Sequence, residues 1–226
     1  MKNSILVLNC GSSSLKFSLI TPDNGETLVS GLAERLLTPE AQLTIKQAGQ
    51  KSTNPLPAPY QHQSAIELVV AYLKTNAFID TIFAIGHRVV HGGEKYSQPT
   101  IITEEVKDNI KALAKLAPLH NPANLQGIAA AEAVFDSLPQ VAIFDTAFHQ
   151  TMAEKAFLYA LPYELYQTHG IRKYGFHGTS HYFVAKSAAK LNHKALAQCN
   201  FISAHLGNGC SISAIRQGQS VDTSLG

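Results

Sequence analysis

A short segment near the start of the chain constrains the fold most strongly, because two apolar strands meet there across a turn of small residues. Residues 5–8 are all apolar, and residues 15–19 alternate apolar with polar side chains, which is the period of a half-buried strand. Gly11 in the turn lets the backbone approach a ligand closely, and successive N–H groups with three hydroxyls form a surface of donors. The segment therefore predicts a β-hairpin whose turn binds an anion such as phosphate.

A turn of this composition has two other interpretations. A Walker loop is excluded, because that motif ends in Gly-Lys-Ser/Thr and opens a helix, whereas Lys16 lies within the outgoing strand. A merely flexible turn stays open on these residues alone, since Gly and Ser mark ordinary turns as well. The rest of the chain has to decide between an ordinary turn and a phosphate site.

The same layout occurs again near the end of the sequence. An apolar strand at 201–204 leads into a glycine-bearing turn at 206–209 and leaves as an alternating strand at 210–215. The spacing is too long for a solenoid repeat, and it suggests two domains built alike, each offering one hairpin to the same phosphate chain. Coincidence stays open, because glycine hairpins are common. We expect a first domain over 1–150, and a helical connection with the incomplete start of a second similar domain over 151–226.

The segments between the hairpins predict an α/β fold, because helical periods alternate with short apolar strands. We expect strands at 28–33, 43–46, 81–85 and 141–144, with a polar link at 49–61. We expect helices that begin at Ser64 in a capping box, at Thr103, at Asn121 followed by Pro122, and after Ser180.

Composition limits the partners. The net charge is +2 and charged residues make up 15% of the chain, so no basic field is available for nucleic acid or an anionic membrane. Three cysteines without paired spacing argue against disulfides and favour a reducing cytoplasm. No run approaches the ~18 apolar residues of a membrane span.

Phosphoryl transfer explains the polar residues at the predicted strand ends better than two rival chemistries. A zinc site is disfavoured, because the pairs His87/His91 and His177/His181 lack the metalloprotease pattern and are surrounded by glycines. A serine hydrolase lacks the Gly-x-Ser-x-Gly elbow. A transferred phosphoryl group needs cations, donors and magnesium along an in-line path. Candidates for these roles are Arg88, His177, Asn9, Asp145 and the two hairpin turns.

Six ordered segments across the chain, 9–17, 86–94, 118–122, 144–149, 174–181 and 205–209, together resemble the acetate kinase family of the sugar kinase and actin superfamily. The resemblance implies a ribonuclease H-like, actin-like ATPase fold and a reversible, Mg²⁺-dependent transfer of the ATP γ-phosphoryl group to acetate, giving acetyl phosphate and ADP. It also implies a cytoplasmic homodimer. No nucleic acid or membrane partner is expected.

On matching positions, the resemblance also implies residue roles. Arg88 would hold the carboxylate, and His177 and His120 would stabilise the phosphoryl group. Asp145 and Asn9 would act around magnesium, with Asn9 as the metal-site residue. The methyl group would contact Val90, Leu119 and Phe176, and the nucleotide phosphates would contact Ser12, Ser14, Lys16, His205, Asn208 and Gly209.

The physical chemistry of the acceptor agrees with these roles. A carboxylate is ionised near neutral pH, so it needs relief from repulsion rather than a strong base, and Asp145 is expected to orient rather than to remove a proton. Acetate kinases supply further groups from beyond residue 226, so we expect weak or no turnover from these residues alone. An actin-type ATP-dependent switch would lack a carboxylate clamp, and a propionate kinase would have a deeper pocket than Val90 allows.

Overall fold

The computed structural model describes residues 3–207 and 209–226, and these form two compact units. Unit 1 comprises Met1–Val89 and Pro99–Ile143, and unit 2 comprises Val90–Gln98 and Phe144–Gly226. Along the chain, the segment 90–98 therefore belongs with the C-terminal part. The domain boundary expected at residue 150 stays a prediction.

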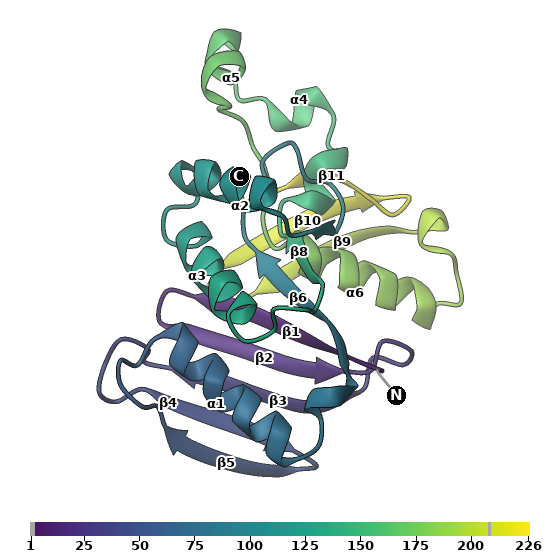
Figure 1. Ribbon diagram of the computed structural model, residues 1–226. Coiled ribbons are helices and arrows are strands. Elements are labelled where there is room, and N and C mark those ends of the chain that lie inside the picture. The colour runs from purple at the N-terminus through teal and green to yellow at the C-terminus, as the bar shows by residue number, and fades with distance from the viewer. Residues whose placement is uncertain (1–2, 208) are drawn as a thin grey trace. The chain divides into compact units, whose positions relative to one another are not determined.

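Unit 1 is built on a mixed sheet with the strand order β5-β4-β3-β2-β1-β6-β8-β7 (Figure 1). Strands β1 to β5 are paired antiparallel in sequence order, β6 is parallel to β1, and β7 is antiparallel to β8. The strands are β1 Ser4–Gly11, β2 Ser14–Ile20, β3 Thr27–Glu34, β4 Gln42–Gln47, β5 Gln50–Pro55, β6 Ile82–Val89, β7 Thr100–Ile101 and β8 Gln140–Phe144. The parallel pairing of β1 and β6 brings the C-terminal ends of these two strands together.

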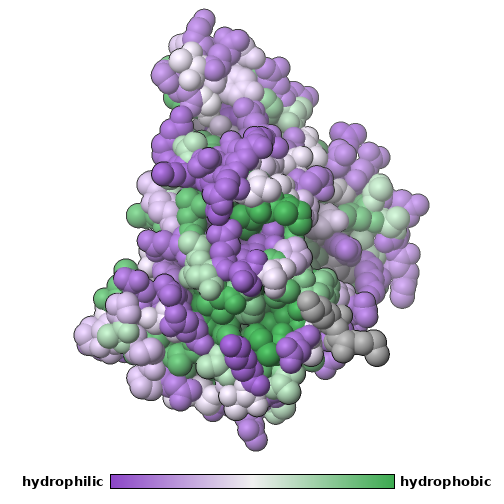
Figure 2. Space-filling view, in the orientation of Figure 1, coloured by the Kyte–Doolittle hydropathy of each residue, from purple (hydrophilic) through white to green (hydrophobic). Residues whose placement is uncertain are grey.

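The core of unit 1 lies between the sheet and the helices α1, His62–Thr75, and α3, Asn121–Glu132. Figure 1 shows both helices on the same face of the sheet. Alternate side chains of β1, namely Leu6, Leu8 and Cys10, are buried on this face. Partly buried apolar side chains pack around the core. On the surface, Figure 2 shows hydrophobic residues near the centre of the view, between hydrophilic side chains. Helix α2 spans Glu104–Ala112.

Unit 2 contains a three-stranded antiparallel sheet with the order β11-β10-β9. Its strands are β9 Asn200–Leu206, β10 Cys210–Arg216 and β11 Gln219–Thr223. Its helices are α4 Glu154–Phe157, α5 Tyr163–His169 and α6 Gly178–Leu191, and a 3-10 helix spans Ala147–Thr151. Helix α6 packs on β9, and the 3-10 helix packs on β11. Among the described helices of both units, none has the length and apolar character needed to cross a bilayer.

Both predicted hairpins are confirmed. Strands β1 and β2 pair up to Gly11 opposite Ser14, and β9 and β10 pair up to Leu206 opposite Cys210. The strands expected at 28–33 and 43–46 are also confirmed as β3 and β4. The cap of α2 is as expected, because the Thr103 hydroxyl accepts from the Val106 N–H.

Several helix starts were predicted wrongly. Helix α1 begins at His62 after Gln61, and Ser64 is a buried residue inside it rather than its cap. The cap of α3 is His120 rather than Asn121. Helix α6 begins at Gly178 after His177, so the glycines near His177 do not prevent a helix there. In each case the first helical residue, His62, Asn121 or Gly178, is buried, which the local sequence does not show.

Two strand boundaries also differ from expectation. The link expected at 49–61 contains β5, whose residues are all exposed and, except for Pro55, polar. An edge strand held by backbone pairing to β4 shows no apolar alternation, so the sequence carries no signal for it. Strand β6 continues through Gly86 to Val89, which places Arg88 inside a strand near its end.

Candidate functional site

Two buried side chains of unit 1 hold the turn between β1 and β2 by hydrogen bonds to its backbone. Asn124 Nδ2 on α3 donates to the Cys10 carbonyl oxygen at 2.8 Å, and His62 Nε2 on α1 donates to the Gly11 carbonyl oxygen at 2.7 Å. Both carbonyl oxygens are therefore occupied by helix side chains. The turn can present N–H groups and the exposed Ser12 hydroxyl to an anion, while its repelling carbonyl dipoles point away.

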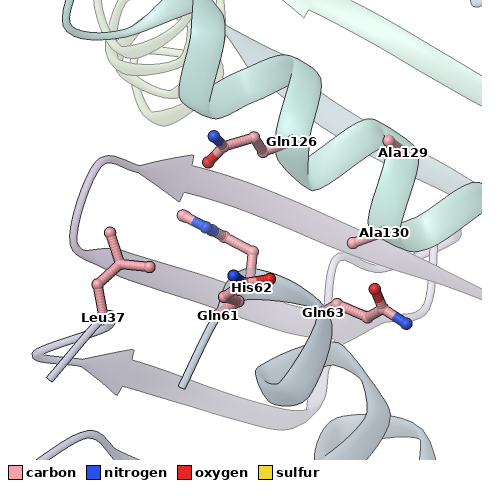
Figure 3. A pocket seen from close by; sticks show the side chains of 7 residues that line it. All are labelled: Leu37, Gln61, His62, Gln63, Gln126, Ala129 and Ala130. Atoms are coloured by element: carbon pink, nitrogen blue, oxygen red, sulfur yellow. The ribbon is translucent and has the colours of Figure 1, made fainter. Parts of the chain in front are cut away.

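His62 also lines a hollow of about 320 Å³ behind this turn, together with side chains from 37, 61, 63, 126, 129 and 130 (Figure 3). Figure 3 shows the imidazole between α3 and the strands, with Gln126 and Leu37 on either side. The hollow is lined by amides and apolar groups rather than by charged side chains. We therefore place the candidate anion-binding residues of unit 1 on the opposite face of the sheet.

Helix α3 approaches β1 unusually closely. A Cβ at Gly127 would lie 2.2 Å from Cys10 Sγ, so only glycine fits at this position. Burial raises the pKa of the Cys10 thiol to about 12, so this thiol is not a nucleophile at neutral pH. The contact positions α3, and with it the Asn124 side chain that holds the hairpin.

Three polar side chains are neighbours on the adjacent strands β2, β1 and β6, on the face of the sheet away from the helices. Lys16 is directly opposite Asn9 in the hairpin, and Arg88 Nη1 donates to Asn9 Oδ1 at 3.2 Å. Because side chains alternate along a strand, Asn9 points away from the buried Leu8 and Cys10. Two cations and an amide therefore gather at one end of the sheet, beside the turn. Such a set attracts and orients an anion.

The other predicted residues of unit 1 lie nearby in sequence to α3 or in the hairpin. His120 caps α3, and both His120 and Leu119 are exposed, Leu119 by 73%. Ser14 is half-buried at the start of β2. These positions leave Leu119 and His120 accessible to a ligand, and their expected contacts stay predictions.

In unit 2, Asp145 is the only buried carboxylic acid among the described residues. Its Oδ1 accepts from Thr179 Oγ1 at 3.0 Å, and its backbone oxygen accepts from the Gly178 N–H at 2.9 Å. A Cβ at Gly178 would lie 2.3 Å from that backbone oxygen. The N-terminus of α6 therefore fixes Asp145, and the helix dipole favours a negative charge there.

His177 caps α6 in the left-handed conformation, with φ of 57°. Its Nδ1 lies 2.9 Å from Ser211 Oγ on β10, and its ring stacks on His205 with centroids 4.0 Å apart. His205 Nδ1 in turn lies 3.0 Å from Ser180 Oγ. A Cβ at Gly209 would lie 3.3 Å from His177 Nε2, so this nitrogen faces the turn of the second hairpin. Asn208, predicted to contact phosphates, lies outside the described residues.

Phe176 and Val90 are half-buried in unit 2. The Phe176 backbone is held by His149, whose Nε2 donates to the Phe176 carbonyl oxygen at 3.0 Å, and its ring packs on His91 with centroids 5.6 Å apart. Burial lowers the pKa of His91 to about 4, which keeps that imidazole neutral near pH 7. Phe176 therefore supplies apolar surface that is held by His149 and lies against His91, and Val90 is a second half-buried apolar side chain.

Sequence reasoning missed the residues that hold the predicted ones in place. Thr179 and His149 lie within 174–181 and 144–149, two of the six segments that carry the family resemblance, so these segments could have pointed to them. His62 and Asn124 lie in segments without a motif, and only the folded structure brings them to the first hairpin. Ser211 lies in the outgoing strand of the second predicted hairpin, but its contact with His177 emerges only from the folded structure.

Comparison with solved structures identifies the class of fold. The chain matches a propionate kinase from Francisella tularensis subsp. tularensis SCHU S4 with a TM-score of 0.94 and 49% identity, over 99% of this chain and 57% of that one. It matches Porphyromonas gingivalis acetate kinase with a TM-score of 0.92 and 43% identity, over the same shares. The fold is the ribonuclease H-like fold of the actin-like ATPases, as expected, with a mixed sheet flanked by helices.

The family model described as the Acetokinase family matches residues 4–226, and the chain belongs to that family. Among curated relatives, acetate kinase 2 of Vibrio cholerae serotype O1 is 54% identical over 228 residues, which cover 100% of this chain and 57% of the relative. The resemblance found in the sequence is thus confirmed. The chain spans little more than half the length of the curated relatives it matches.

Proposed function

We propose that the protein carrying this chain is an ATP:acetate phosphotransferase that makes acetyl phosphate and ADP reversibly. The observation that carries the proposal is the Arg88–Asn9 contact beside the β1–β2 turn, since it places a fixed guanidinium next to a phosphate-type hairpin. The names of the relatives support the same activity. ATP and ADP, with acetate and acetyl phosphate, are the proposed substrates.

Arg88 is proposed to bind the acetate carboxylate. An ionised carboxylate needs no general base, but its approach to a polyphosphate is unfavourable unless a cation lies between the two anions. A planar guanidinium meets a carboxylate with two parallel hydrogen bonds, and the Asn9 amide oxygen fixes its orientation. Val90, Leu119 and Phe176 are proposed to contact the methyl group.

The phosphoryl group in transfer is proposed to receive hydrogen bonds from His177 and His120. Asp145 is proposed to orient rather than to accept a proton, because its Oδ1 already accepts from Thr179. Ser12, Ser14, Lys16, His205, Asn208 and Gly209 are proposed to contact the nucleotide phosphates. These groups are hydroxyls, cations, amides and backbone N–H donors, the chemistry that phosphate oxygens require.

Mg²⁺ is the proposed cofactor, and the residues present fit its chemistry in part. Among the described residues no group of three or more His, Cys, Asp or Glu could hold a metal. Mg²⁺ commonly binds one or two carboxylates, waters and substrate phosphates, so the single buried carboxylate of Asp145 fits such a site. Asn9 fits less well, because Arg88 already donates to its amide oxygen. When bound, the ion would neutralise charge on the phosphates.

A propionate kinase is the second candidate, favoured by the 49% identity to the Francisella tularensis propionate kinase. Val90 fills space and favours the shorter acid. If Val90 sets the acid length, Val90→Ala should raise kcat/KM for propionate relative to acetate. An unchanged ratio would remove this argument.

We further propose a cytoplasmic homodimer without nucleic acid or membrane partners. The cytoplasmic location rests on the three free cysteines, two of them buried. The homodimer rests on the family resemblance alone. The weak charge, +2 over 226 residues, supports the absence of a nucleic acid partner.

The test uses the full-length protein that carries this chain, and it traps acetyl phosphate with hydroxylamine in reactions with ATP, Mg²⁺ and acetate. Loss of charge-assisted hydrogen bonds worth about 1.5–3 kcal/mol should raise KM for acetate roughly 10- to 100-fold in Arg88→Ala. The matched control is Arg216→Ala, which removes an exposed arginine at the end of β10. Acetyl phosphate formation that is equal in both variants would contradict the proposal.

A further inference from the structure

A buried chain of alternating hydroxyls and imidazoles leads to His177 in unit 2. Ser203 Oγ on β9 lies 3.0 Å from His181 Nδ1, and His181 Nε2 lies 2.8 Å from Ser211 Oγ on β10. The same Ser211 oxygen lies 2.9 Å from His177 Nδ1. Ser211 and His181 are fully buried and Ser203 is 6% exposed. We call these four residues the Ser203–His177 chain.

The hydrogen bonds of this chain can run in only one of two directions. Ser211 has a single hydroxyl hydrogen, so it donates to at most one imidazole, and accepting from both would leave this buried hydrogen without an acceptor. It therefore donates to one imidazole and accepts from the other. If it donates to His177, then His181 Nε2 carries a proton and His181 Nδ1 accepts from Ser203. If it donates to His181, every bond reverses, and Ser203 accepts from His181 Nδ1–H.

Ser203 decides between the two directions. Within the part of the chain that the structure describes, its hydroxyl has one hydrogen-bond partner, His181 Nδ1. In the reversed direction the buried Ser203 O–H would have no acceptor, whereas in the forward direction only a lone pair lacks a partner. An unpaired buried donor is the more costly of the two. The forward direction, from Ser203 toward His177, is therefore favoured.

His181 stays neutral, as this direction requires. Burial, and after it the nearby imidazoles of His149, His177 and His205, together lower its pKa to about 4. His149 is also held neutral by burial, and it packs edge to face on His181 with centroids 5.7 Å apart. His177 is therefore linked to Ser203 through Ser211 and an imidazole, His181, that carries no charge near pH 7.

We propose that Ser211 and His181 are positioning residues that fix His177 as its Nε2–H tautomer. With Ser211 donating to Nδ1, the other ring nitrogen of a neutral His177 carries the proton and faces the Gly209 turn. A nitrogen lone pair at this position would repel a phosphoryl oxygen, whereas an N–H donates to it. The consequence for catalysis rests on the proposed function, but the tautomer itself does not.

The test is the tautomeric state of His177 in the ¹⁵N-labelled chain, read near pH 7 from its imidazole ¹⁵N shifts and long-range ¹H–¹⁵N correlations. We expect His177 to be protonated at Nε2, and His181 to be protonated at Nε2 as well. Ser211→Ala removes the donor to His177 Nδ1, and His177 should shift toward the Nδ1–H form. His177 protonated mainly at Nδ1 in the unaltered chain would overturn the proposal, whether or not any variant folds.

Ser213→Ala is the matched control, because Ser213 is equally buried two residues further along β10 but lies outside the Ser203–His177 chain. It should leave the His177 spectrum unchanged, and an equal response in both variants would overturn the proposal. In the active protein, Ser211→Ala should lower kcat about tenfold or more with KM values within about twofold. If the unaltered protein proves not to be a kinase, only the proposed function fails, since the tautomer is measured without turnover.

Discussion

The close contact between α3 and β1 gives a prediction whose sign and size follow from the packing. By helix propensity alone, Gly127→Ala would stabilise the protein by about 1 kcal/mol. The new Cβ, however, would lie 2.2 Å from Cys10 Sγ and 2.8 Å from Cys10 Cβ. Favourable carbon contacts lie at about 3.5–4.0 Å, so helix and strand must separate by roughly 1 Å. Overpacking of this kind costs about 1–3 kcal/mol.

We therefore expect Gly127→Ala to lower the free energy of unfolding by up to about 2 kcal/mol after the propensity gain is subtracted. Equilibrium urea unfolding followed by circular dichroism measures this change. The control is Gly86→Ala in the same unit, where a Cβ would meet Ile143 Cδ1 at an ordinary 3.7 Å. This control should be neutral or stabilising by up to about 1 kcal/mol.

A double-mutant cycle assigns the cost to the contact itself. Cys10→Ala removes the sulfur that the new methyl group meets, so the cost of Gly127→Ala should shrink by about 1 kcal/mol in that background. Stabilisation by Gly127→Ala in the unaltered background would refute the reasoning. Strictly additive single changes would refute it too.

Three further predictions concern both units. Gly178→Ala should abolish phosphoryl transfer in the hydroxylamine assay, because its Cβ would meet the Asp145 backbone oxygen at 2.3 Å; full activity would contradict this. Burial lowers the pKa of His87 and of His181 from 6.5 to about 4, so below pH 6.5 the unfolded chain binds more protons than the folded one. The free energy of unfolding should fall as pH drops from 6.5 to 4, by up to about 1.4 kcal/mol per pH unit for each histidine, and urea midpoints that are flat over this window would disagree. Arg88→Lys should restore less than a tenth of the acetate affinity lost in the alanine variant, since an ammonium cannot form the bidentate pair; full rescue would argue against it.

The hairpins could be predicted from the sequence because a strand period of two and a glycine turn are local signals. Residues 5–8 and 15–19 carry the alternation of half-buried strands, and the register that follows places Asn9 opposite Lys16. The helix α2 was predictable for the same reason, since Thr103 caps it three residues before a buried valine. Local sequence pattern therefore predicts the β1–β2 hairpin, which carries Asn9 and Lys16 of the candidate site.

What could not be predicted depends on contacts between residues far apart in the chain. The His62 bond to Gly11 joins positions 51 residues apart, and the Asn124 bond to Cys10 joins positions 114 apart. Neither partner has a recognisable motif. The exposed strand β5 was missed because its stability comes from backbone pairing, and the start of α6 was missed because His177 adopts a positive φ that its sequence does not announce.

The most direct test of the account is a titration of the labelled protein with acetyl phosphate, followed at the side chains of Arg88 and His177 by NMR. Because Arg88 and His177 are proposed to act on the same ligand, both signals should titrate with one dissociation constant. Arg88→Ala should then weaken the response of His177, whereas Arg216→Ala should not. Two different dissociation constants, or a response at only one of the two residues, would contradict the central claim.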